Sequence, residues 1–257
     1  MNVKKTFPKR LCDALARSGV DIFYYASLDS TSAEARRYAR SHPDCPPTLF
    51  VADAQSEGRG RLGRSFFSPE GTGLYMTLLL PRESICSFGR LTALCAVALR
   101  GSIESIFKIS SGIKWVNDLY INEKKVSGIL AESFFSGEKS FVSIGIGVNI
   151  STEDFPSELG DVACSLIPGD ERKDLKLELA CEVCRRIIIC LGESDTKKYM
   201  DEYRAHSCII GSKILFYENG VGHEALATGI NDEGELLVSV NGEQKVLSSG
   251  EISVRKI

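Results

Sequence analysis

The chain has 257 residues, a formal net charge of -3 and a hydrophobic fraction of 43%. This composition is typical of a soluble globular protein and excludes a disordered chain, a collagen-like repeat and a coiled coil. The small negative net charge gives no general attraction for nucleic acid or for anionic membranes, so a site for a polyanion would have to be a local basic cluster.

The nine cysteines indicate a reducing compartment, because their number is odd and most of them stand in apolar runs. Cys181 and Cys184 have the spacing of a redox or metal pair, but their segment has helical periodicity and no second pair follows, which favours simple packing. No apolar h-region follows the basic N-terminus, and no apolar run approaches the roughly 20 residues of a membrane span. We therefore expect a cytoplasmic protein with no membrane partner.

Hydrophobic periodicity in the first half of the chain predicts alternating helices and strands. A long loop at 55–72, rich in Gly, Ser and Arg, interrupts them, and loops of that length are usually functional or mobile. Thr31 and Glu34 have the spacing of a capping box at the start of the second helix, and Pro43 ends that helix. In chain order we predict a helix near 11–18, a strand at 20–26, a helix at 33–41, strands at 48–54 and 73–80, and a helix at 90–106.

The second half changes period and predicts an antiparallel meander, then helices, then a small all-β region. Three strands at 113–121, 124–134 and 140–149 are joined by turns at 122–123 and 136–138, and a polar loop at 151–170 leads to helices at 172–191 and 195–205. From Cys208 onward, short alternating segments are separated by the hairpin signals Asn219-Gly220 and Asn241-Gly242. We therefore expect two domains, 1–206 and 207–257.

Residues 58–64 read Gly-Arg-Gly-Arg-Leu-Gly-Arg and fit the G-x-G-x-x-G pattern of dinucleotide-binding proteins. The context does not fit, because the loop leads through turn residues to another strand, whereas a Rossmann turn opens directly into a helix. What remains is a loop with three guanidiniums whose glycines let backbone N–H groups approach an anion, which suits a phosphate ester or an acyl phosphate. A solvated basic loop or a nucleic-acid contact are the alternatives.

Several motifs, taken together in this order, resemble the biotin-protein ligases from about residue 22 to the C-terminus. Each motif alone is weak, but the combination is specific. The chain lacks the N-terminal helix-turn-helix domain of the repressor-type members and so looks like the ligase-only class. The motifs are Asp29-Ser30-Thr31-Ser32, Gln55, the loop 58–64, Lys114-Trp115-Val116-Asn117-Asp118-Leu119, Lys125-Val126-Ser127-Gly128-Ile129-Leu130, Gly145-Ile146-Gly147-Val148-Asn149 and Gly250-Glu251-Ile252-Ser253.

The resemblance implies an α+β fold: a class II synthetase-like mixed sheet with flanking helices, followed by a small SH3-like β-barrel. It implies two reactions, in which biotin and ATP with Mg²⁺ give biotinyl-5'-AMP and pyrophosphate, and a lysine amine of a carrier then attacks the adenylate. The implied partner is a biotin carboxyl carrier protein or domain of acetyl-CoA carboxylase, with no DNA, and the protein would be a monomer or a homodimer. A lipoate or octanoate ligase or transferase is the nearest alternative, and a nucleic-acid-binding protein using loop 58–64 is a more distant one.

The resemblance also assigns roles to individual residues. Arg59, Arg61 and Lys125 would be catalytic, and Asp118 would be the Mg²⁺ ligand. The biotin-binding residues would be Ser30, Thr31, Ser32, Gln55, Gly58, Arg59, Gly60, Arg61, Lys125 and Gly128. The ATP-binding residues would be Arg61, Arg64, Asn117, Asp118, Lys125 and Asn149.

Each assignment has a purely structural alternative. Ser30 and Thr31 could be helix caps, Lys125 could be an edge-strand lysine, and Asn117 with Asp118 could form a hairpin turn. Strand alternation places Lys125 opposite to Lys124, so one of them can point into a site while the other is solvated. The sequence departs from common family forms at Ser32, Val116 and Phe66, where Asn, Pro and Trp are frequent, and the adenine-contacting loop within 151–168 carries no assignable residues.

Overall fold

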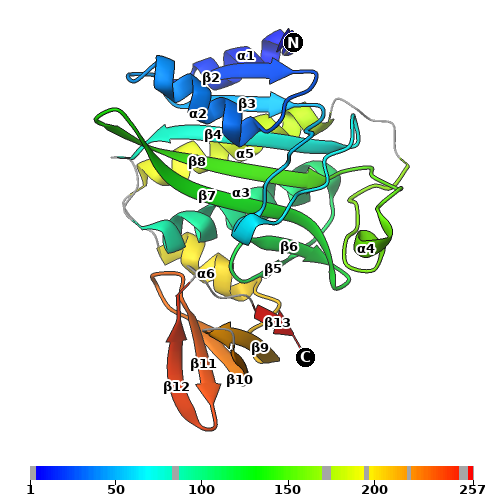
Figure 1. Cartoon of the computed structure of the whole chain (residues 1–257), viewed down its shortest axis with the longest axis vertical. Helices are drawn as coiled ribbons and strands as arrows, with labels where there is room; N and C mark the ends of the chain where they lie inside the picture. Colours follow the sequence, from blue (N-terminus) through cyan, green and yellow to red (C-terminus); the bar gives the residue numbers. More distant parts are fainter. Residues whose placement is uncertain are drawn as a thin grey trace.

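The computed structural model describes residues 4–82, 87–169, 175–193, 197–218, 221–248 and 254–256. Over this part of the chain the backbone forms two separate β-sheets with helices packed mainly on the larger one (Figure 1). Three features expected from the sequence lie outside the described residues: the turn Asn219-Gly220, the motif 250–253 and the first turn of the helix expected at 172–191.

Within the described residues the larger sheet has eight strands in the order β1-β2-β3-β4-β8-β7-β6-β5. Strands β2 and β3 are parallel and the other neighbours are antiparallel, so the sheet is mixed, as expected for an α+β fold. The strands are β1 (Lys4–Lys5), β2 (Asp21–Tyr25), β3 (Thr48–Ala52), β4 (Gly73–Pro81), β5 (Gly112–Lys114), β6 (Asp118–Ile121), β7 (Lys124–Ser136) and β8 (Lys139–Asn149).

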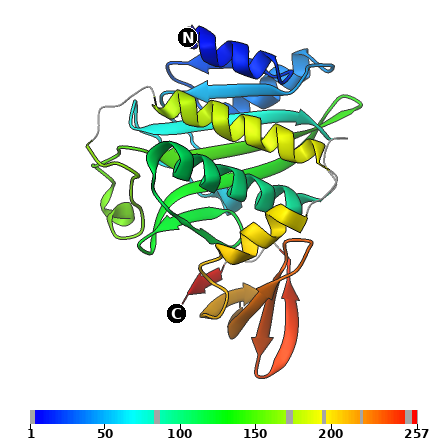
Figure 2. The ribbon, with the colours of Figure 1, turned by 180° about the vertical axis from the view of Figure 1, so that it is seen from behind.

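Helices cover both faces of this sheet (Figures 1 and 2). One face carries α1 (Lys9–Ala16), α3 (Phe88–Phe107) and α5 (Leu175–Gly192), and the main hydrophobic core lies between these helices and the sheet. The other face carries α2 (Thr31–Ser41) over a smaller core. Strand β3 is buried along its whole length because it lies between the two layers, which explains why the residues that follow Thr48 are all apolar. The remaining helices are α4 (Ser157–Gly160), α6 (Lys197–Ala205) and a 3-10 turn, η1 (Arg61–Gly63).

The strand expected at 113–121 is instead a hairpin, with β5 and β6 paired through a turn at 115–117. The Trp115–Val116 peptide bond within this turn is cis. The sequence suggested one continuous strand because two of the three turn residues are apolar, and the structure buries them, leaving Trp115 5% and Val116 3% exposed. The meander therefore has four strands, not three. Its turn at Asn122 and Glu123 was predicted correctly, and both residues have the positive φ of a tight hairpin turn.

The capping box expected at Thr31 and Glu34 is wrong. The N-cap of α2 is Ser30, and its hydroxyl makes no capping hydrogen bond. The Glu34 carboxylate turns away from the helix start to accept hydrogen bonds from Arg37 and Tyr25. The hydroxyls at the start of α2 are therefore not used to cap the helix.

The second sheet has the order β12-β11-β10-β9-β13, and all of its described neighbours are antiparallel. Its buried residues, such as Phe216 and Leu236, belong to the same core cluster as the helices of the larger sheet. Asn241 and Gly242 form the expected tight turn with positive φ. The strands are β9 (Lys213–Glu218), β10 (Val221–Ile230), β11 (Leu236–Val240), β12 (Glu243–Leu247) and β13 (Val254–Lys256). Among the described residues, no helix is long and apolar enough to cross a membrane.

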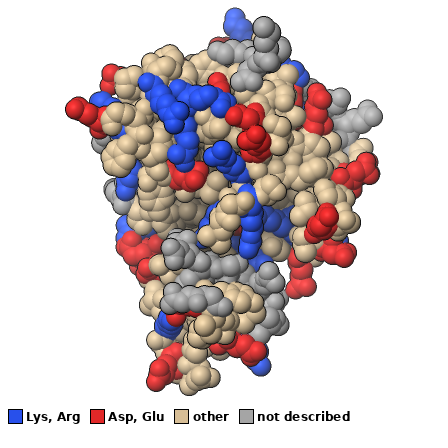
Figure 3. Space-filling view, in the orientation of Figure 1, with Lys and Arg blue, Asp and Glu red and all other residues tan. Residues whose placement is uncertain are grey.

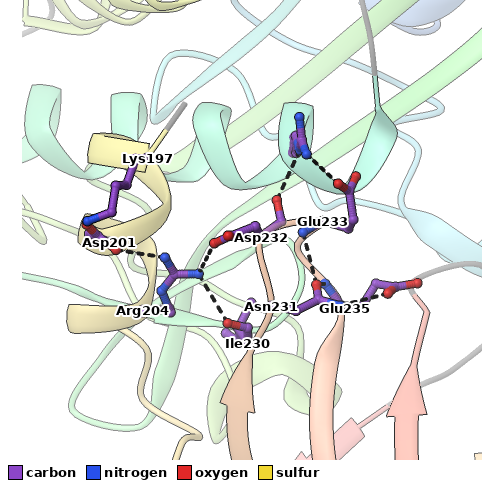
Figure 4. A network of polar contacts seen from close by, with 9 residues as sticks. Lys197, Asp201, Arg204, Ile230, Asn231, Asp232, Glu233 and Glu235 are labelled. Carbon is purple, nitrogen blue, oxygen red and sulfur yellow. Dashed lines mark hydrogen bonds and ion pairs between the residues drawn. The ribbon is translucent and has the colours of Figure 1, made fainter. Parts of the chain in front are cut away.

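The turn between β10 and β11 docks the second sheet onto the helices (Figure 4). Arg204 of α6 donates to the Asp232 carboxylate at 2.9 Å and to the Ile230 carbonyl at 3.2 Å. Arg90 of α3 donates to the Asp232 carbonyl at 3.0 Å and pairs with the Glu233 carboxylate. These contacts fix the turn against the start of α3 and the end of α6.

Gly89→Ala tests this docking, because a Cβ at Gly89 would meet the Glu233 carbonyl oxygen well inside van der Waals distance. We expect a loss of roughly 1–3 kcal/mol in the free energy of unfolding, measured by urea denaturation. Gly192→Ala is the matched control, since Gly192 is also a helical glycine and its Cβ would meet nothing within 4 Å. Equal stability of the two variants would contradict a tight contact at Gly89.

Candidate active site

A cavity of about 1150 Å³ lies beside the start of α2, under the loop at 58–66 and over strands β7 and β8. It brings together residues that are up to 179 positions apart in the sequence, from Ser30 to Ile209. Gly58 and Asn149 do not line it. The expected site residues that do are Ser30, Thr31, Ser32, Gln55, Arg59, Gly60, Arg61, Arg64, Asn117, Asp118, Lys125 and Gly128.

One end of the cavity is built from neutral hydroxyl and amide groups. The backbone N–H and the hydroxyl of Thr31 both donate to Oε1 of Gln55, at 2.8 and 3.0 Å. Nε2 of Gln55 donates to Ser68 at 3.1 Å. Ser30, Thr31 and Ser32 are all buried, so their polar groups need hydrogen-bond partners in the protein or in the cavity.

An ion pair outside the cavity holds Ser30 in place. The backbone N–H of Ser30 donates to Asp29 Oδ1 at 2.7 Å, and Arg37 binds the same carboxylate through two hydrogen bonds at 2.7 and 2.8 Å. These contacts with Arg37 and the Ser30 N–H lower the pKa of Asp29 from its ordinary 3.8 to about 2. The charged carboxylate therefore orders the residue that begins α2.

The Gly/Arg loop is a short hairpin that lies over the cavity. The Gly60 N–H donates to the Arg64 carbonyl at 2.7 Å, and the Phe66 N–H donates to the Gly58 carbonyl at 2.8 Å. Gly58 is required by this packing, because a Cβ there would overlap the Phe66 carbonyl oxygen. Gly58 thus shapes the loop without lining the cavity. The loop turns at Leu62 and Gly63, which both have positive φ.

Arg61 points from the loop to the opposite wall, where it donates to Oδ1 of Asn117 at 3.3 Å. Asn117 is itself fixed to β7, since its side-chain amide donates to the Ile129 carbonyl at 2.6 Å and its own carbonyl accepts from the Ile129 N–H at 2.8 Å. Burial lowers the pKa of the Arg61 guanidinium, and the nearby Asp118 carboxylate opposes that shift. An arginine remains charged in either case.

Lys125 and Asp118 form an ion pair in the cavity, with Nζ and Oδ1 2.7 Å apart. A bulge in β7 lies between Lys125 and Ser127, opposite Leu119 and Tyr120, and it brings Lys125 and Gly128 to the same face. Gly128 leaves room for the pair, because a Cβ there would lie 3.0 Å from Lys125 Nζ. Lys124 points elsewhere and donates to the Gly160 carbonyl at 2.9 Å, in agreement with the expected alternation.

Asn149 lies outside the cavity wall and holds a neighbouring segment. Its amide donates to the Cys164 carbonyl at 3.2 Å, and its carbonyl accepts from the Leu166 N–H at 3.1 Å. Asn149 thus supports the 164–166 segment within the described part of the loop 151–170.

The structure adds residues that sequence reasoning did not assign to the site. Lys114 lines the cavity and stands over the Tyr120 ring, 4.6 Å from its centroid. Phe66 lies on Gly147, where a Cβ would be 2.5 Å from the ring. The basic position of Lys114 in the Lys-Trp motif was the available signal, and only the hairpin at 115–117 shows that this lysine turns into the site.

Trp115 also lines the cavity, and it reaches the second sheet. Its indole N–H donates to the Gly234 carbonyl at 2.9 Å, so the docked turn between β10 and β11 supports the cavity wall. Tyr203 of α6 donates to the Val116 carbonyl at 2.8 Å. The turn at 115–117 is therefore held from three sides, by the second sheet, by α6 and by β7.

The cavity is cationic although the chain is not. Figure 3 shows Lys and Arg side chains gathered near the middle of the face that carries α2 and the loop. Among the described residues, the cavity is lined by two acidic side chains, Asp118 and Glu123, and by five basic ones, Arg59, Arg61, Arg64, Lys114 and Lys125. A space with neutral polar groups at one end and excess positive charge at the other fits an elongated ligand with a polyanionic part.

The fold and site define a ligase of the biotin and lipoate type, and comparison with known proteins supports this class. Residues 24–149 match the "Biotin/lipoate A/B protein ligase family" and residues 213–255 match the "Biotin protein ligase C terminal domain". The chain is 36% identical over 253 residues to the bifunctional ligase/repressor BirA of Bacillus subtilis, covering 92% of this chain and 74% of that protein.

Two further relatives agree. The chain is 27% identical to the biotin--[acetyl-CoA-carboxylase] ligase of Mycobacterium tuberculosis, covering 88% of this chain and 86% of that protein. The solved structure of the biotin protein ligase from Aquifex aeolicus in complex with biotin and ATP superimposes with a TM-score of 0.78 at 27% identity, covering 92% of this chain and 99% of that one. The chain belongs to the biotin protein ligase family.

Acid titration tests the anchoring of Ser30 by Asp29. The pKa of Asp29 is lowered in the folded protein, so its ionised form stabilises the fold fully above the ordinary value of 3.8, and that stability is lost as the pH falls toward about 2. We expect the wild type to lose stability between pH 4 and pH 2 more steeply than Asp29→Asn, as measured by urea denaturation. Parallel stability curves would contradict the role of the Asp29 charge.

Proposed function

We propose that the protein activates biotin with ATP, as biotinyl-5'-AMP, and transfers the biotinyl group to a lysine of a carrier domain. The division of the cavity carries this proposal. The Ser30, Thr31 and Gln55 end offers neutral donors and acceptors suited to the ureido ring of biotin. The Arg59, Arg61 and Lys125 part offers positive charge where a carboxylate and a triphosphate would meet.

The first reaction joins two anions, so its main difficulty is electrostatic. A biotin carboxylate oxygen attacks the α-phosphorus of ATP, the bond to the bridging oxygen breaks, and pyrophosphate leaves with the electron pair. Arg59, Arg61 and Lys125 would hold the carboxylate and the α-phosphate together and stabilise the charge on the phosphoryl oxygens. Arg64 and Lys114 would lie toward the nucleotide. No general base is needed, because the carboxylate is already ionised at neutral pH.

The second reaction requires that the mixed anhydride survive until a carrier arrives. The neutral lysine amine of the carrier attacks the acyl carbon, AMP leaves with the electrons of the acyl–oxygen bond, and the nitrogen loses a proton. The loop 58–64 would cover the anhydride, with Arg61 on the phosphate, and exclude water in the meantime. Its position over the cavity, joined to Asn117, supports this role.

Mg²⁺ fits this site as a companion of ATP. The described residues contain no cluster of three or more His, Cys, Asp or Glu side chains that could hold a metal by themselves. Asp118 supplies one carboxylate on the cavity wall, and Mg²⁺ is commonly bound by one or two carboxylates together with substrate phosphates. When bound, the ion would neutralise phosphate charge. Lys125 would then leave its ion pair with Asp118 and pair with the substrate anions.

Further proposals concern the surroundings of the reaction. The carrier would be a biotin carboxyl carrier protein or domain of acetyl-CoA carboxylase, as the name of the mycobacterial relative suggests. The residues 207–257 would form a second domain of SH3-like barrel type, after a catalytic domain at 1–206. The protein would act in the cytoplasm, as a monomer or a homodimer, without DNA. A lipoate or octanoate ligase and a nucleic-acid-binding protein are not favoured, because the mycobacterial relative and the Aquifex aeolicus structure are biotin ligases.

Pyrophosphate exchange into ATP, run in parallel with biotin, lipoate and octanoate, tests the proposal. We expect exchange with biotin alone and a bound product with the mass of biotinyl-5'-AMP. Lys125→Ala should lower the exchange rate by roughly 100-fold or more, because it removes the cation shared by carboxylate and phosphate. Lys124→Ala is the matched control, since the adjacent Lys124 points away to Gly160. Exchange with lipoate instead of biotin would contradict the substrate assignment.

Arg61→Ala tests the covering role of the loop. Loss of the guanidinium should speed the release of preformed biotinyl-5'-AMP by roughly tenfold or more, because a charged hydrogen bond to the phosphate is removed. Stopped-flow dissociation with excess biotin as competitor gives this rate. Arg40→Ala, on the exposed end of α2, is a control for the loss of one positive charge. An unchanged release rate for Arg61→Ala would leave the loop without a sealing function.

A further inference from the structure

A chain of hydroxyl groups runs from the cavity wall into the sheet. The hydroxyls of Ser32 and Thr77 are 3.1 Å apart, and the Thr77 hydroxyl donates to Thr31 at 2.8 Å. Thr31 in turn donates to Oε1 of Gln55 at 3.0 Å. Thr77 lies on β4, is fully buried and does not line the cavity, whereas the other three residues do.

The direction of every proton in this chain is determined at the Gln55 end. The backbone N–H of Thr31 lies 2.8 Å from the same Gln55 atom, and an N–H can only donate, so that atom is the amide oxygen. An amide oxygen only accepts, so the Thr31 hydroxyl must donate its single proton to Gln55. The Thr31 hydroxyl can then only accept a hydrogen bond from Thr77, and this bond takes the single hydroxyl proton of Thr77. The remaining contact therefore requires Ser32 to donate to Thr77.

The other side of Gln55 is fixed in the same way. Its Nε2 donates to the Ser68 hydroxyl at 3.1 Å, and the Ser68 hydroxyl donates to the Phe66 carbonyl at 2.9 Å. Both ends of the amide therefore agree on its orientation. A flip of Gln55 would disrupt three hydrogen bonds, two with Thr31 and one with Ser68, in a partly buried place where each unmade bond costs free energy.

We propose that Thr77 is a positioning residue that commits the Ser32 oxygen to act as a hydrogen-bond acceptor for a ureido N–H of biotin. With its proton directed to Thr77, Ser32 presents only lone pairs to the cavity. The Ser30 hydroxyl is not constrained by a cap and can donate, as can the second N–H of Gln55, so the ureido oxygen has donors beside it. This inference rests on the proposed function, because it takes biotin as the ligand.

The close packing of Ser32 supports a fixed acceptor. A Cβ on Gly145 of β8 would lie 3.0 Å from Ser32 Oγ, so the hydroxyl lies directly above the strand backbone and has little room to turn. Ser32 is 7% exposed, so its lone pairs face the cavity and not bulk water. A ligand that cannot donate at this point would leave a buried acceptor unpaired, which is a strong source of discrimination.

Thr77→Val and Ser32→Ala test the proposal by calorimetric titration with biotin and with two analogues, each methylated on one of the ureido nitrogens. In the wild type we expect one analogue to bind roughly tenfold or more weakly than biotin, because it has lost the proton that Ser32 accepts. Thr77→Val frees the Ser32 proton and should weaken biotin binding by roughly tenfold, while Thr77→Ser should restore it. In Ser32→Ala the difference between biotin and that analogue should shrink.

Thr48→Val is the matched control, because Thr48 is a fully buried threonine on the adjacent strand β3 whose side chain bonds the Pro46 carbonyl and the Cys45 thiol, neither of which lines the cavity. It should bind biotin as the wild type does. The KM for ATP should stay unchanged in Thr77→Val, which separates the effect from general damage to the site. If Thr77→Val does not fold, Ser32→Ala still tests the acceptor role of Ser32, on which the proposal depends, since Ser32 lies at the cavity wall.

Failure of the inference and failure of the proposed function give different results. A wild type that does not bind biotin overturns the proposed function. A wild type that binds biotin, together with Thr77→Val and Ser32→Ala variants that bind it equally well and discriminate against both analogues as before, overturns the role of Thr77 alone.

Discussion

The site holds five basic side chains around one cavity, and their mutual repulsion has to be balanced. The ion pair between Lys125 and Asp118 makes this possible, because it places the one well-positioned carboxylate among the guanidiniums of Arg61 and Arg64. A bulge in β7 turns Lys125 toward that carboxylate, and the absence of a side chain at Gly128 leaves the space. The pair holds the Lys125 ammonium at the cavity wall, where, in the proposed reaction, an anionic ligand would replace the carboxylate.

The net charge of the whole chain is a poor guide to such a site. A protein with a net charge of -3 presents a cationic cavity because the basic residues come from separate segments: a loop, a hairpin and a bulged strand. Each segment is only locally basic in the sequence. The neutral end, around Thr31 and Gln55, is separated from the charged part along the same cavity, so one ligand can meet a hydrogen-bonding environment and an electrostatic one at its two ends.

Local signals in the sequence predicted most strands and helices, and the family resemblance named twelve of the residues that line the cavity. The turn at Asn122 and Glu123 was predictable because its chemistry is local. The hairpin at 115–117 was not, since its two apolar turn residues are buried by distant elements, among them α6. Thr77 was hidden for a similar reason: it is a single polar residue in an apolar strand, and only the fold brings its hydroxyl to the start of α2.

The contact between Trp115 and Gly234 bears on how this protein could be divided for expression. A fragment that stopped before β9 would leave a buried indole N–H without its acceptor, and the guanidiniums of Arg90 and Arg204 without the turn that they bind. It would also cut through a shared hydrophobic core that includes Phe216. The two sheets are separate in hydrogen bonding, yet they share buried contacts, so we expect a fragment without the second sheet to be less stable than the whole chain.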